Sequence, residues 1–259
     1  QVVAQFHEWM TGAGLLYLKS ALPQVGCVFT THATVLGRCV AGNNLPLYGE
    51  MKNYVPEELA RRFNVVSKQS LEKASAWNAD CFTTVSDIEC AHFLNKEVDL
   101  ITPNGFENVF TPKEDEWFEK RVCAREKFLQ IAQALLGRPV DENALIVGTS
   151  GRYEFRNKGI DVFIDAMGRL NGESGLDREV LAFILVPASH SDPNKELLHN
   201  LQQPNQATPA KNLYLTHYLT DEVNDAVMNR IKVMKLNNGE NDKVKIFFVP
   251  SYLNGNDGV

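Results

Sequence analysis

The sequence predicts an α/β protein in which helices cover parallel sheets. Short apolar runs alternate with longer helical patterns along the 259 residues, and this alternation is typical of strand–helix–strand units. Apolar residues make up 44% of the chain, which is enough to fill a sizeable core, and charged residues make up an ordinary 22%. The length allows two modest domains or one large domain.

Seven apolar runs are predicted to be strands. They cover residues 1–6, 25–31, 80–85, 98–102, 144–149, 179–187 and 244–249. Six stretches between them are predicted to be helices, and these cover residues 10–21, 56–78, 87–96, 114–136, 159–171 and 220–236. Because the two kinds of element alternate, parallel strand pairing is expected.

Two of the predicted helices follow residues that can cap them. Ser86 and Glu89 form a capping box, in which the serine side chain accepts a hydrogen bond from the glutamate N–H and the glutamate reaches back. Thr220 precedes Asp221 and Glu222, which places a cap and two acids at the positive end of a helix dipole. The sequence therefore predicts helix starts near residues 87 and 220.

Two stretches interrupt the alternation. Residues 103–113 contain two prolines and a glycine and lead into a charged helix, which indicates a crossover between two strand–helix units. Residues 188–219 are polar and contain three prolines. We expect this second stretch to be an insertion that leaves the core and supports no strand of a sheet.

Charge and cysteine content limit the class of protein. The formal net charge of -6, with no basic tract, argues against a nucleic-acid or membrane partner. The five cysteines are scattered, and three lie in apolar segments, so free thiols in the cytoplasm are expected rather than disulfides or a zinc site. The chain starts within a strand-like run, without methionine, and stops within a turn-rich segment, so we expect a fragment of a longer protein.

Polar side chains follow several predicted strands, where ligands collect in parallel sheets. His32 and Arg38 lie in TTHATVLGR, residues 30–38, and Glu8 lies beside a second histidine in FHEWMTG, residues 6–12. These groups could act in acid–base chemistry. On the residues alone, a structural histidine, a surface arginine and a buried hydrogen-bonded pair remain the alternatives.

A third cluster lies in GTSGRYEFRNKG, residues 148–159, which joins a strand to a helix. Its glycines allow the backbone to approach a ligand, and its cations, among them Arg152 and Lys158, favour an anion at the helix start. A solvated basic turn balanced by Glu154 is the alternative. Tyr252 follows the last strand and could stack on a base or simply pack.

Six segments resemble the glycogen synthases of animals and fungi, which form family 3 of the glycosyltransferases. They are FHEWMTG, FTTHATVLGR, ADCFTTVSDIE, ITPNGF, SGRYEFRNKGIDVFIDAMGRLN and KIFFVPSYLNG, in the family's order and approximate spacing. The resemblance covers residues 1–171 and resumes near residue 215. TTHAT-x-LGR and GRYE-aromatic-(K/R)-NKG are specific to this family, whereas PNG and TVS are shared by many related transferases.

This resemblance implies a GT-B fold, in which two Rossmann-like domains with parallel sheets flank a cleft. Residues 1–106 would form the second half of the amino-terminal domain, and residues 107–259 the first part of the carboxy-terminal domain. The implied reaction is retaining transfer of glucose from UDP-glucose, or from ADP-glucose, to the non-reducing end of an α-1,4-glucan in glycogen biosynthesis. Such enzymes need no metal or cofactor, because protein cations neutralise the leaving diphosphate.

The resemblance also implies roles for single residues. Arg152 and Lys158 match the family's diphosphate-binding pair, and Arg38 matches another arginine on the donor side. Tyr252 falls where the family has an aromatic residue stacked on the uracil. His32 matches the histidine beside the reacting glucose, and Glu8, in the HEW motif on the acceptor side, is predicted with it as catalytic.

Parts of the family's active site, a glycine-rich loop and a pair of glutamates, have no counterpart in this sequence, so the fragment alone is expected to be inactive. Its partners would be a nucleotide sugar, glycogen and, if it assembles as the family does, further copies of itself. The alternatives are another GT-B glycosyltransferase, a glucan phosphorylase and a non-catalytic glucan-binding relative. Retention of the phosphate-binding cations favours an enzyme.

Overall fold

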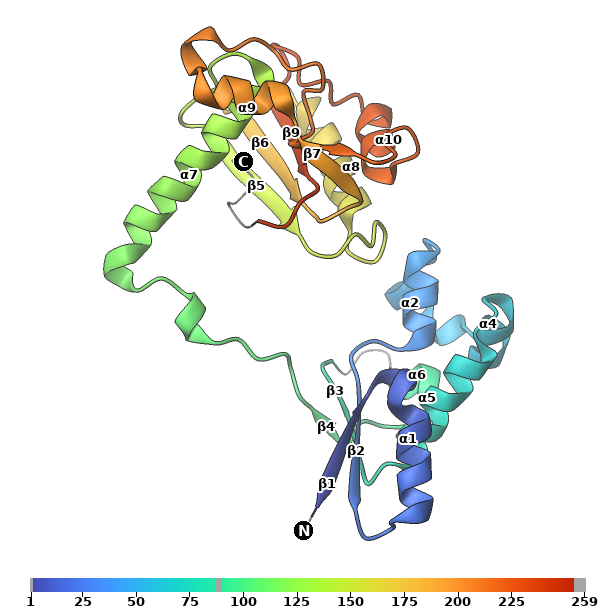
Figure 1. The fold of residues 1–259 in the computed structure, drawn as a ribbon. Helices are drawn as coiled ribbons and strands as arrows, with labels where there is room; N and C mark the ends of the chain where they lie inside the picture. The colour runs from blue at the N-terminus through green and yellow to red at the C-terminus, as the bar shows by residue number, and fades with distance from the viewer. Residues whose placement is uncertain (1, 87–89, 254–259) are drawn as a thin grey trace. The chain divides into compact units, whose positions relative to one another are not determined.

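The computed structural model describes residues 2–86 and 90–253 of the chain. The chain divides into two compact units, residues 1–108 and residues 109–259 (Figure 1). Each unit has its own parallel sheet and its own buried clusters. The mixed α/β class with parallel sheets is therefore confirmed, and each of the seven predicted strands overlaps a strand of the structure.

Unit 1 is built on a four-stranded parallel sheet in the order β1-β2-β3-β4. The strands are β1 (Val3–His7), β2 (Gly26–Thr31), β3 (Cys81–Thr84) and β4 (Leu100–Ile101). Helices α1 (Glu8–Ala21) and α5 (Val66–Asn78) pack against each other beside this sheet (Figure 1). The core between them contains Leu15, Phe29, Ala76 and Phe82, none of which is exposed.

A second cluster in unit 1 lies under short helices. These are α2 (Val35–Gly42), α3 (Leu47–Glu50), α4 (Pro56–Arg62) and α6 (Cys90–Leu94). The single helix predicted over residues 56–78 is wrong, because α4 and α5 are separated by residues 63–65. Asn64 adopts a left-handed φ of 56°, and Phe63 and Val65 on either side pack on this cluster. Burial of those two apolar residues favours the break over a continuous helix.

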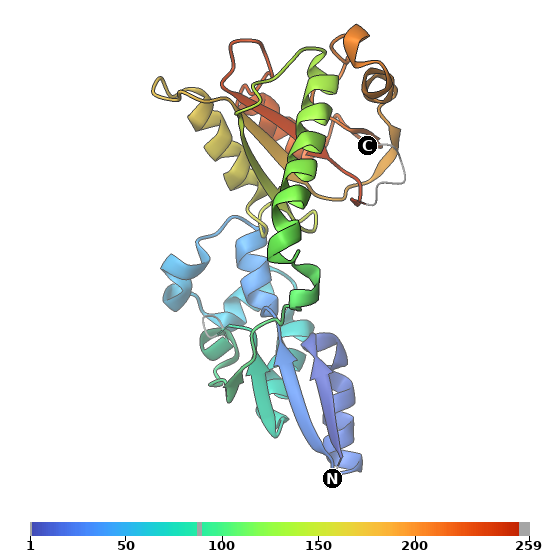
Figure 2. The same ribbon diagram turned by 90° about the vertical axis from the view of Figure 1, so that its left-hand side faces the viewer.

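Unit 2 is built on a three-stranded parallel sheet in the order β5-β6-β9, with strands β5 (Leu145–Ser150), β6 (Val180–Leu185) and β9 (Val244–Val249). Helices α8 (Ile160–Asn171) and α10 (Ala226–Val233) cover one face, and α7 (Glu114–Leu136) and α9 (Lys195–Gln202) cover the other (Figures 1 and 2). Along β6 the residues alternate between the two faces: Ala182 packs towards α8, whereas Phe183 packs towards α7.

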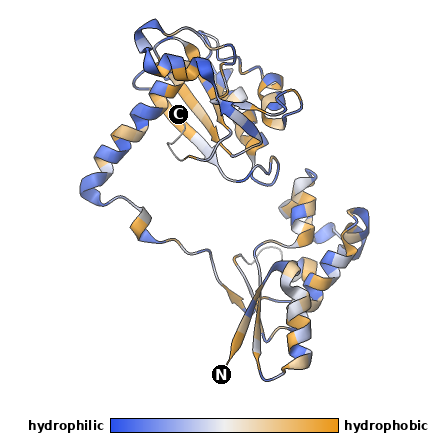
Figure 3. Ribbon diagram, in the orientation of Figure 1, coloured by the Kyte–Doolittle hydropathy of each residue, from blue (hydrophilic) through white to orange (hydrophobic). Residues whose placement is uncertain are grey.

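Because β6 is covered on both faces, its sequence is apolar throughout. Hydrophobic residues concentrate on the strands of this sheet, whereas the first turns of α7 are mostly hydrophilic (Figure 3). The buried residues of α7 all lie near its carboxyl end, from Ile131 to Leu136. The sheet is therefore packed by the end of α7, where Gly137 stops the helix with a φ of 63°.

Residues 188–219 do not leave the core, so the prediction of a surface excursion is wrong. Strands β7 (His190–Pro193) and β8 (His217–Leu219) form an antiparallel pair, and Leu215 makes a parallel bridge to Phe248 of β9. Helix α9 packs against α7 and buries Leu197 completely. This segment therefore packs on both faces of the sheet, with Leu197 in the cluster beside α7 and Leu215 in the cluster beside α8.

The polar residues of this segment explain why its sequence was misleading. The fully buried Asn194 caps α9, and Asn200 donates hydrogen bonds of 2.7 Å to the carbonyls of Ala134 and Thr208. Their amides pair with buried backbone groups, so these residues stabilise a packed structure instead of facing water. The segment also packs closely on Gly137 at the end of α7. A Cβ at this position would lie 2.0 Å from the Pro209 nitrogen.

The predicted helix start at Thr220 is also wrong. Helix α10 begins at Ala226, and the Asp225 side chain caps it by accepting a hydrogen bond from Met228 N–H. Asp221 instead accepts hydrogen bonds from Asn224 within a turn. Asp221, Glu222 and Asp225 lie close together, and more than one of them could start the helix. In the structure Asp225 is the N-cap residue. The capping box of Ser86 and Glu89 lies partly outside the described residues.

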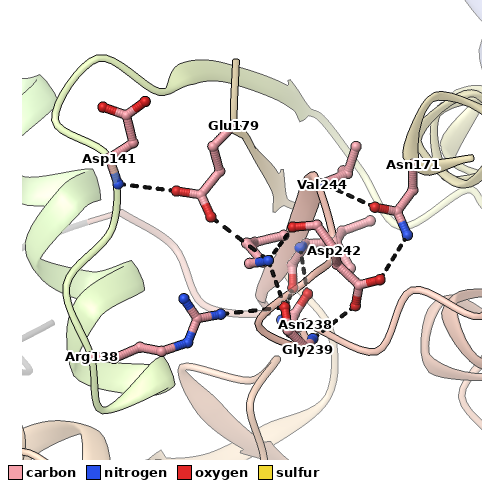
Figure 4. Close-up of polar contacts among 10 residues, drawn as sticks. Arg138, Asp141, Asn171, Glu179, Asn238, Gly239, Asp242 and Val244 are labelled. Atoms are coloured by element: carbon pink, nitrogen blue, oxygen red, sulfur yellow. Dashed lines mark hydrogen bonds and ion pairs between the residues drawn. The ribbon is translucent and has the colours of Figure 1, made fainter. Parts of the chain in front are cut away.

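A network of polar contacts joins several segments at the amino end of the unit 2 sheet (Figure 4). The side chain of Lys245, on β9, is fully buried and donates hydrogen bonds to the carbonyls of Gly239 and Asp242. Its Nζ lies 3.7 Å from Glu179 Oε1, and Arg138 donates to the same Gly239 carbonyl. Burial lowers the pKa of the Lys245 ammonium. The carbonyls and the carboxylate compensate the charge and hold the loop before β9.

Candidate functional site

The sequence-predicted residues of unit 1 come together where its first two strands end. Strands β1 and β2 are parallel neighbours, with His7 opposite Thr30, so the residues that follow them lie side by side. The Glu8 carboxylate accepts a hydrogen bond of 2.9 Å from the backbone N–H of His32. The same oxygen lies 3.7 Å from the guanidinium of Arg38. The structure thus places His32, Glu8 and Arg38 in one group.

Helix starts position two members of this group. Arg38 lies on α2 rather than in a loop, and α2 begins after Thr34, whose side chain accepts a hydrogen bond from Gly37 N–H. Glu8 begins α1 with a left-handed φ of 64°. That conformation costs a residue with a Cβ about 1–3 kcal/mol and is concentrated at functional sites. Its carboxylate then points back to the β2 end instead of outwards.

A second histidine joins the group. His7 Nδ1 lies 3.1 Å from His32 Nε2, and the two rings are stacked with centroids 5.3 Å apart. In this hydrogen bond one ring donates and the other accepts. Both side chains are exposed to solvent. A ligand can therefore reach both rings, and His7, which the sequence offers with Glu8 as a possible acid–base pair, lies in the same group as His32.

The sequence analysis also missed Glu72, which hydrogen-bonds to the loop that carries His32. Glu72, on α5, is fully buried, and its carboxylate accepts hydrogen bonds from Thr31 Oγ1 at 3.3 Å and from Val35 N–H at 3.0 Å. These two residues flank the loop that carries His32. A glutamate in the middle of a polar helix looks like a solvent-facing residue, so no local pattern identifies it.

In unit 2 the predicted residues lie between β5 and α8. Gly151 has a φ of 154°, and Gly159, with a φ of 65°, is the N-cap residue of α8. Between them Arg152 is exposed and pairs with Glu154 at 2.9 Å. The Lys158 side chain is exposed, and its backbone N–H bonds the Glu154 carbonyl. Two glycines thus shape a loop that presents cations at the carboxyl end of the sheet.

A pocket of about 440 Å³ lies beside this loop. Arg152 lines one side and Tyr252 another, together with Gly151, Leu185 and Pro187. Tyr252 is three-quarters exposed, so a flat aromatic group can stack on its ring. The structure brings Arg152 and Tyr252 to one pocket, whereas Lys158 is not among the residues that line it.

Tyr153 also lines this pocket and is bonded to Asp225, the N-cap residue of α10. Its hydroxyl donates a hydrogen bond to the Asp225 carboxylate, and its ring stacks on Phe248 of β9. Burial, followed by the bond to Asp225, raises the pKa of Tyr153 well above its usual range. The hydroxyl therefore stays protonated and acts as a fixed donor. Its role depends on a residue far away in the sequence, so it was not predicted.

Arg156 is exposed to solvent and also pairs with a buried acid. Its guanidinium lies 2.6 Å from the carboxylate of Asp161, which is buried in the first turn of α8, and stacks on Phe155. Arg152, only four positions earlier, is far more exposed. The two arginines of one motif thus have different surroundings: Arg156 pairs with a buried acid, and Arg152 lines the pocket.

Two absences concern the described residues alone. Over residues 2–86 and 90–253, no three histidine, cysteine, aspartate or glutamate side chains lie together as metal ligands would. None of the helices described there has the length and hydropathy to span a bilayer.

The sequence matches known proteins along its whole length. A family model described as glycogen synthase matches residues 1–207. Isoform 2 of glycogen [starch] synthase from Saccharomyces cerevisiae is 29% identical over 100% of this chain and 46% of its own length. The Neurospora crassa glycogen [starch] synthase is 28% identical, and the human liver protein 27%, each over 97% of this chain and 44% of its own length. The chain thus spans about half the length of the curated relatives it matches.

Proposed function

Because the chain belongs to the glycogen synthase family, we propose that the protein transfers glucose from a nucleotide diphosphate sugar to the non-reducing end of an α-1,4-glucan, with retention of the anomeric configuration. UDP-glucose is the proposed donor, ahead of ADP-glucose. Glycogen is the proposed acceptor, in a cytoplasmic enzyme that works without a metal. The donor, the acceptor and the location come from the family resemblance together with the scattered cysteines.

One observation carries the donor side of this proposal. The Arg152 guanidinium and the exposed Tyr252 ring line the same pocket of about 440 Å³. A guanidinium matches the oxygens of a diphosphate, and an exposed aromatic face suits a nucleobase. Those are the two ends of a nucleotide diphosphate. The pocket lies at the carboxyl end of a parallel sheet, where ligands of α/β proteins collect.

In the proposed reaction, negative charge grows on the diphosphate as the glycosidic bond breaks. Arg152, which lines the pocket, is proposed to lie beside the leaving group, and Lys158, on the same loop, is proposed to approach it when the donor binds. Cations fixed in this way stabilise the transition state more than the ground state. His32, hydrogen-bonded to Glu8 through its backbone, is proposed to lie beside the reacting glucose, with Arg38 on the donor side.

The experiment is a transfer assay with the full-length protein, glycogen and either labelled donor. Arg152→Ala should lower kcat by about 10²–10³ and leave the melting temperature almost unchanged, because the ion pair of Arg152 with Glu154 is exposed to solvent. Lys232→Ala, which removes an exposed cation of α10, is the matched control and should keep full activity. Unchanged kcat in Arg152→Ala would remove this residue from the donor site. Absence of glucan elongation with both donors would overturn the proposed function.

A further inference from the structure

His7 bonds to the side chain of His32, and the proposed reaction assigns it no role. Its Nδ1 lies 3.1 Å from His32 Nε2, and the two rings are stacked with an interplanar angle of 21°. This bond occupies Nε2 of His32. Over residues 2–86 and 90–253, Nδ1 of His32 has no hydrogen-bond partner. Nδ1 is therefore the ring nitrogen that remains for a ligand.

Two successive residues hold His32 through different groups. The His7 ring bonds the His32 ring, and the Glu8 carboxylate accepts a hydrogen bond from the backbone N–H of His32. In an extended chain, neighbouring side chains point in opposite directions. The left-handed φ of 64° at Glu8 breaks this alternation where β1 meets α1. Strain of this kind concentrates at functional sites, and here it allows both side chains to reach one partner.

The backbone that carries His7 is held by contacts of its own. The hydroxyl of Thr11 donates to the carbonyl of His7 at 2.9 Å and shares its proton with the carbonyl of Glu8 at 3.1 Å. The pairing of β1 with β2 places His7 opposite Thr30, two residues before His32. His7 is therefore fixed by groups other than the His32 ring, and it can act as a stationary partner for that ring.

We propose that His7 is a positioning residue, which fixes the orientation and the tautomer of the His32 ring and so leaves Nδ1 of His32 to face the reacting glucose. This inference rests on the proposed function, in which His32 lies beside that glucose. A neutral imidazole carries its proton on one nitrogen, so the bond at Nε2 also determines whether Nδ1 of His32 is protonated. A ring that is oriented before the donor binds loses less conformational freedom in the transition state.

The test is the transfer assay with the full-length protein in three variants of His7. His7→Phe keeps an aromatic ring without its nitrogens, so it should lower kcat about tenfold and keep the KM for the donor within about twofold of the parent. His7→Asn places an amide where Nδ1 lies and should keep at least about a third of the parent kcat. His7→Gln, whose amide lies one bond further out, should lose as much as His7→Phe. His199→Phe, at an exposed histidine of α9, is the control and should keep full activity.

Two further measurements separate positioning from a general loss of structure. In the His32→Ala background, His7→Phe should cause no further loss of kcat, because the two residues act as one unit. In ¹⁵N NMR of the histidine-labelled chain, His7→Phe should change the tautomer ratio of His32 and leave that of His199 unchanged. Circular dichroism confirms that each variant is folded.

Several results would overturn the inference while the proposed function stands. These are an unchanged kcat in His7→Phe, equal losses in His7→Phe and His7→Asn, a further loss in the double variant, and an unchanged tautomer ratio of His32. Absence of glucan elongation by the parent would overturn the proposed function and, with it, the part of the inference that concerns the glucose. The NMR measurement needs no substrate, so it tests the bond between the two rings in either case.

Discussion

The buried carboxylate of Glu72 accepts a hydrogen bond of 3.0 Å from the backbone N–H of Val35, the first residue of α2. It also accepts one from Thr31, the last residue of β2. The loop between Thr31 and Val35 carries His32 and is thus held by a side chain of α5. Hydrogen bonds from the loop replace the water that the carboxylate loses on burial.

Glu72→Ala should destabilise unit 1. The change leaves the buried N–H of Val35 without its acceptor, and each such loss costs about 1–3 kcal/mol. Urea denaturation followed by circular dichroism measures the difference. Glu97→Ala, at an exposed glutamate of the same unit, is the control and should stay within about 0.5 kcal/mol of the parent. Equal stability of the two variants would mean that Glu72 does not hold the loop.

Arg156→Ala should destabilise unit 2, because Asp161 would keep a buried carboxylate without its guanidinium partner. We expect a loss of about 1–3 kcal/mol in urea denaturation. Arg152→Ala, four positions earlier, removes only an exposed ion pair and should be nearly neutral. Adding Asp161→Asn to Arg156→Ala should restore part of the loss. A neutral Arg156→Ala variant would show that the buried acid does not need this arginine.

Leu197→Ala should cost about 2–5 kcal/mol, because it empties a fully buried position between α9 and α7. Leu198→Ala removes the same atoms from a half-buried position of the same helix, so it should cost clearly less. Chemical denaturation compares the two. Replacement of residues 188–219 by a Gly/Ser linker should abolish the cooperative unfolding of unit 2. A cooperative transition that survives this replacement would restore the idea of a surface excursion.

Asp165 should make unit 2 sensitive to acid. The bond to Arg230, followed by the nearby arginine charges, lowers the pKa of Asp165 below its ordinary value of 3.8. The ionised carboxylate therefore stabilises the fold above about pH 3.8, and this contribution is lost as the pH falls through the lowered value. In thermal melts from pH 6 to pH 2, the melting temperature of the parent should fall as Asp165 becomes protonated. The Asp165→Asn variant should show a smaller fall over this pH range. An equal fall of the melting temperature in the parent and in Asp165→Asn would show that Asp165 does not contribute to the acid sensitivity.

The sequence was most informative where structure depends on local pattern. The strands of both sheets were predicted from apolar runs, and the helix predicted over residues 114–136 has the bounds of α7. Motifs at the strand ends led to His32, Glu8 and Arg38, which the structure brings together. Their catalytic and binding roles stay predictions, as does the assignment of the two units to the halves of a GT-B enzyme.

The sequence was least informative where a side chain acts at a distance. Glu72 and Tyr153 bond to residues in other elements, so nothing near them in the sequence marks them. Residues 188–219 look polar because Asn194 and Asn200 are buried with their amides paired, which composition cannot reveal. Several acidic residues near residue 220 could cap a helix, so the sequence did not show that Asp225 is the one that caps α10.

The labelling rate of the buried Lys245 can report how often the structure around it opens. Amine-reactive labels modify an exposed lysine such as Lys211 as fast as the reagent allows, whereas Lys245 becomes reactive only when the loop before β9 opens. Mass spectrometry of the labelled peptides over time would give the rate of that opening without any substitution in the chain. A ligand that tightens this end of the sheet would slow the labelling of Lys245 and leave that of Lys211 unchanged.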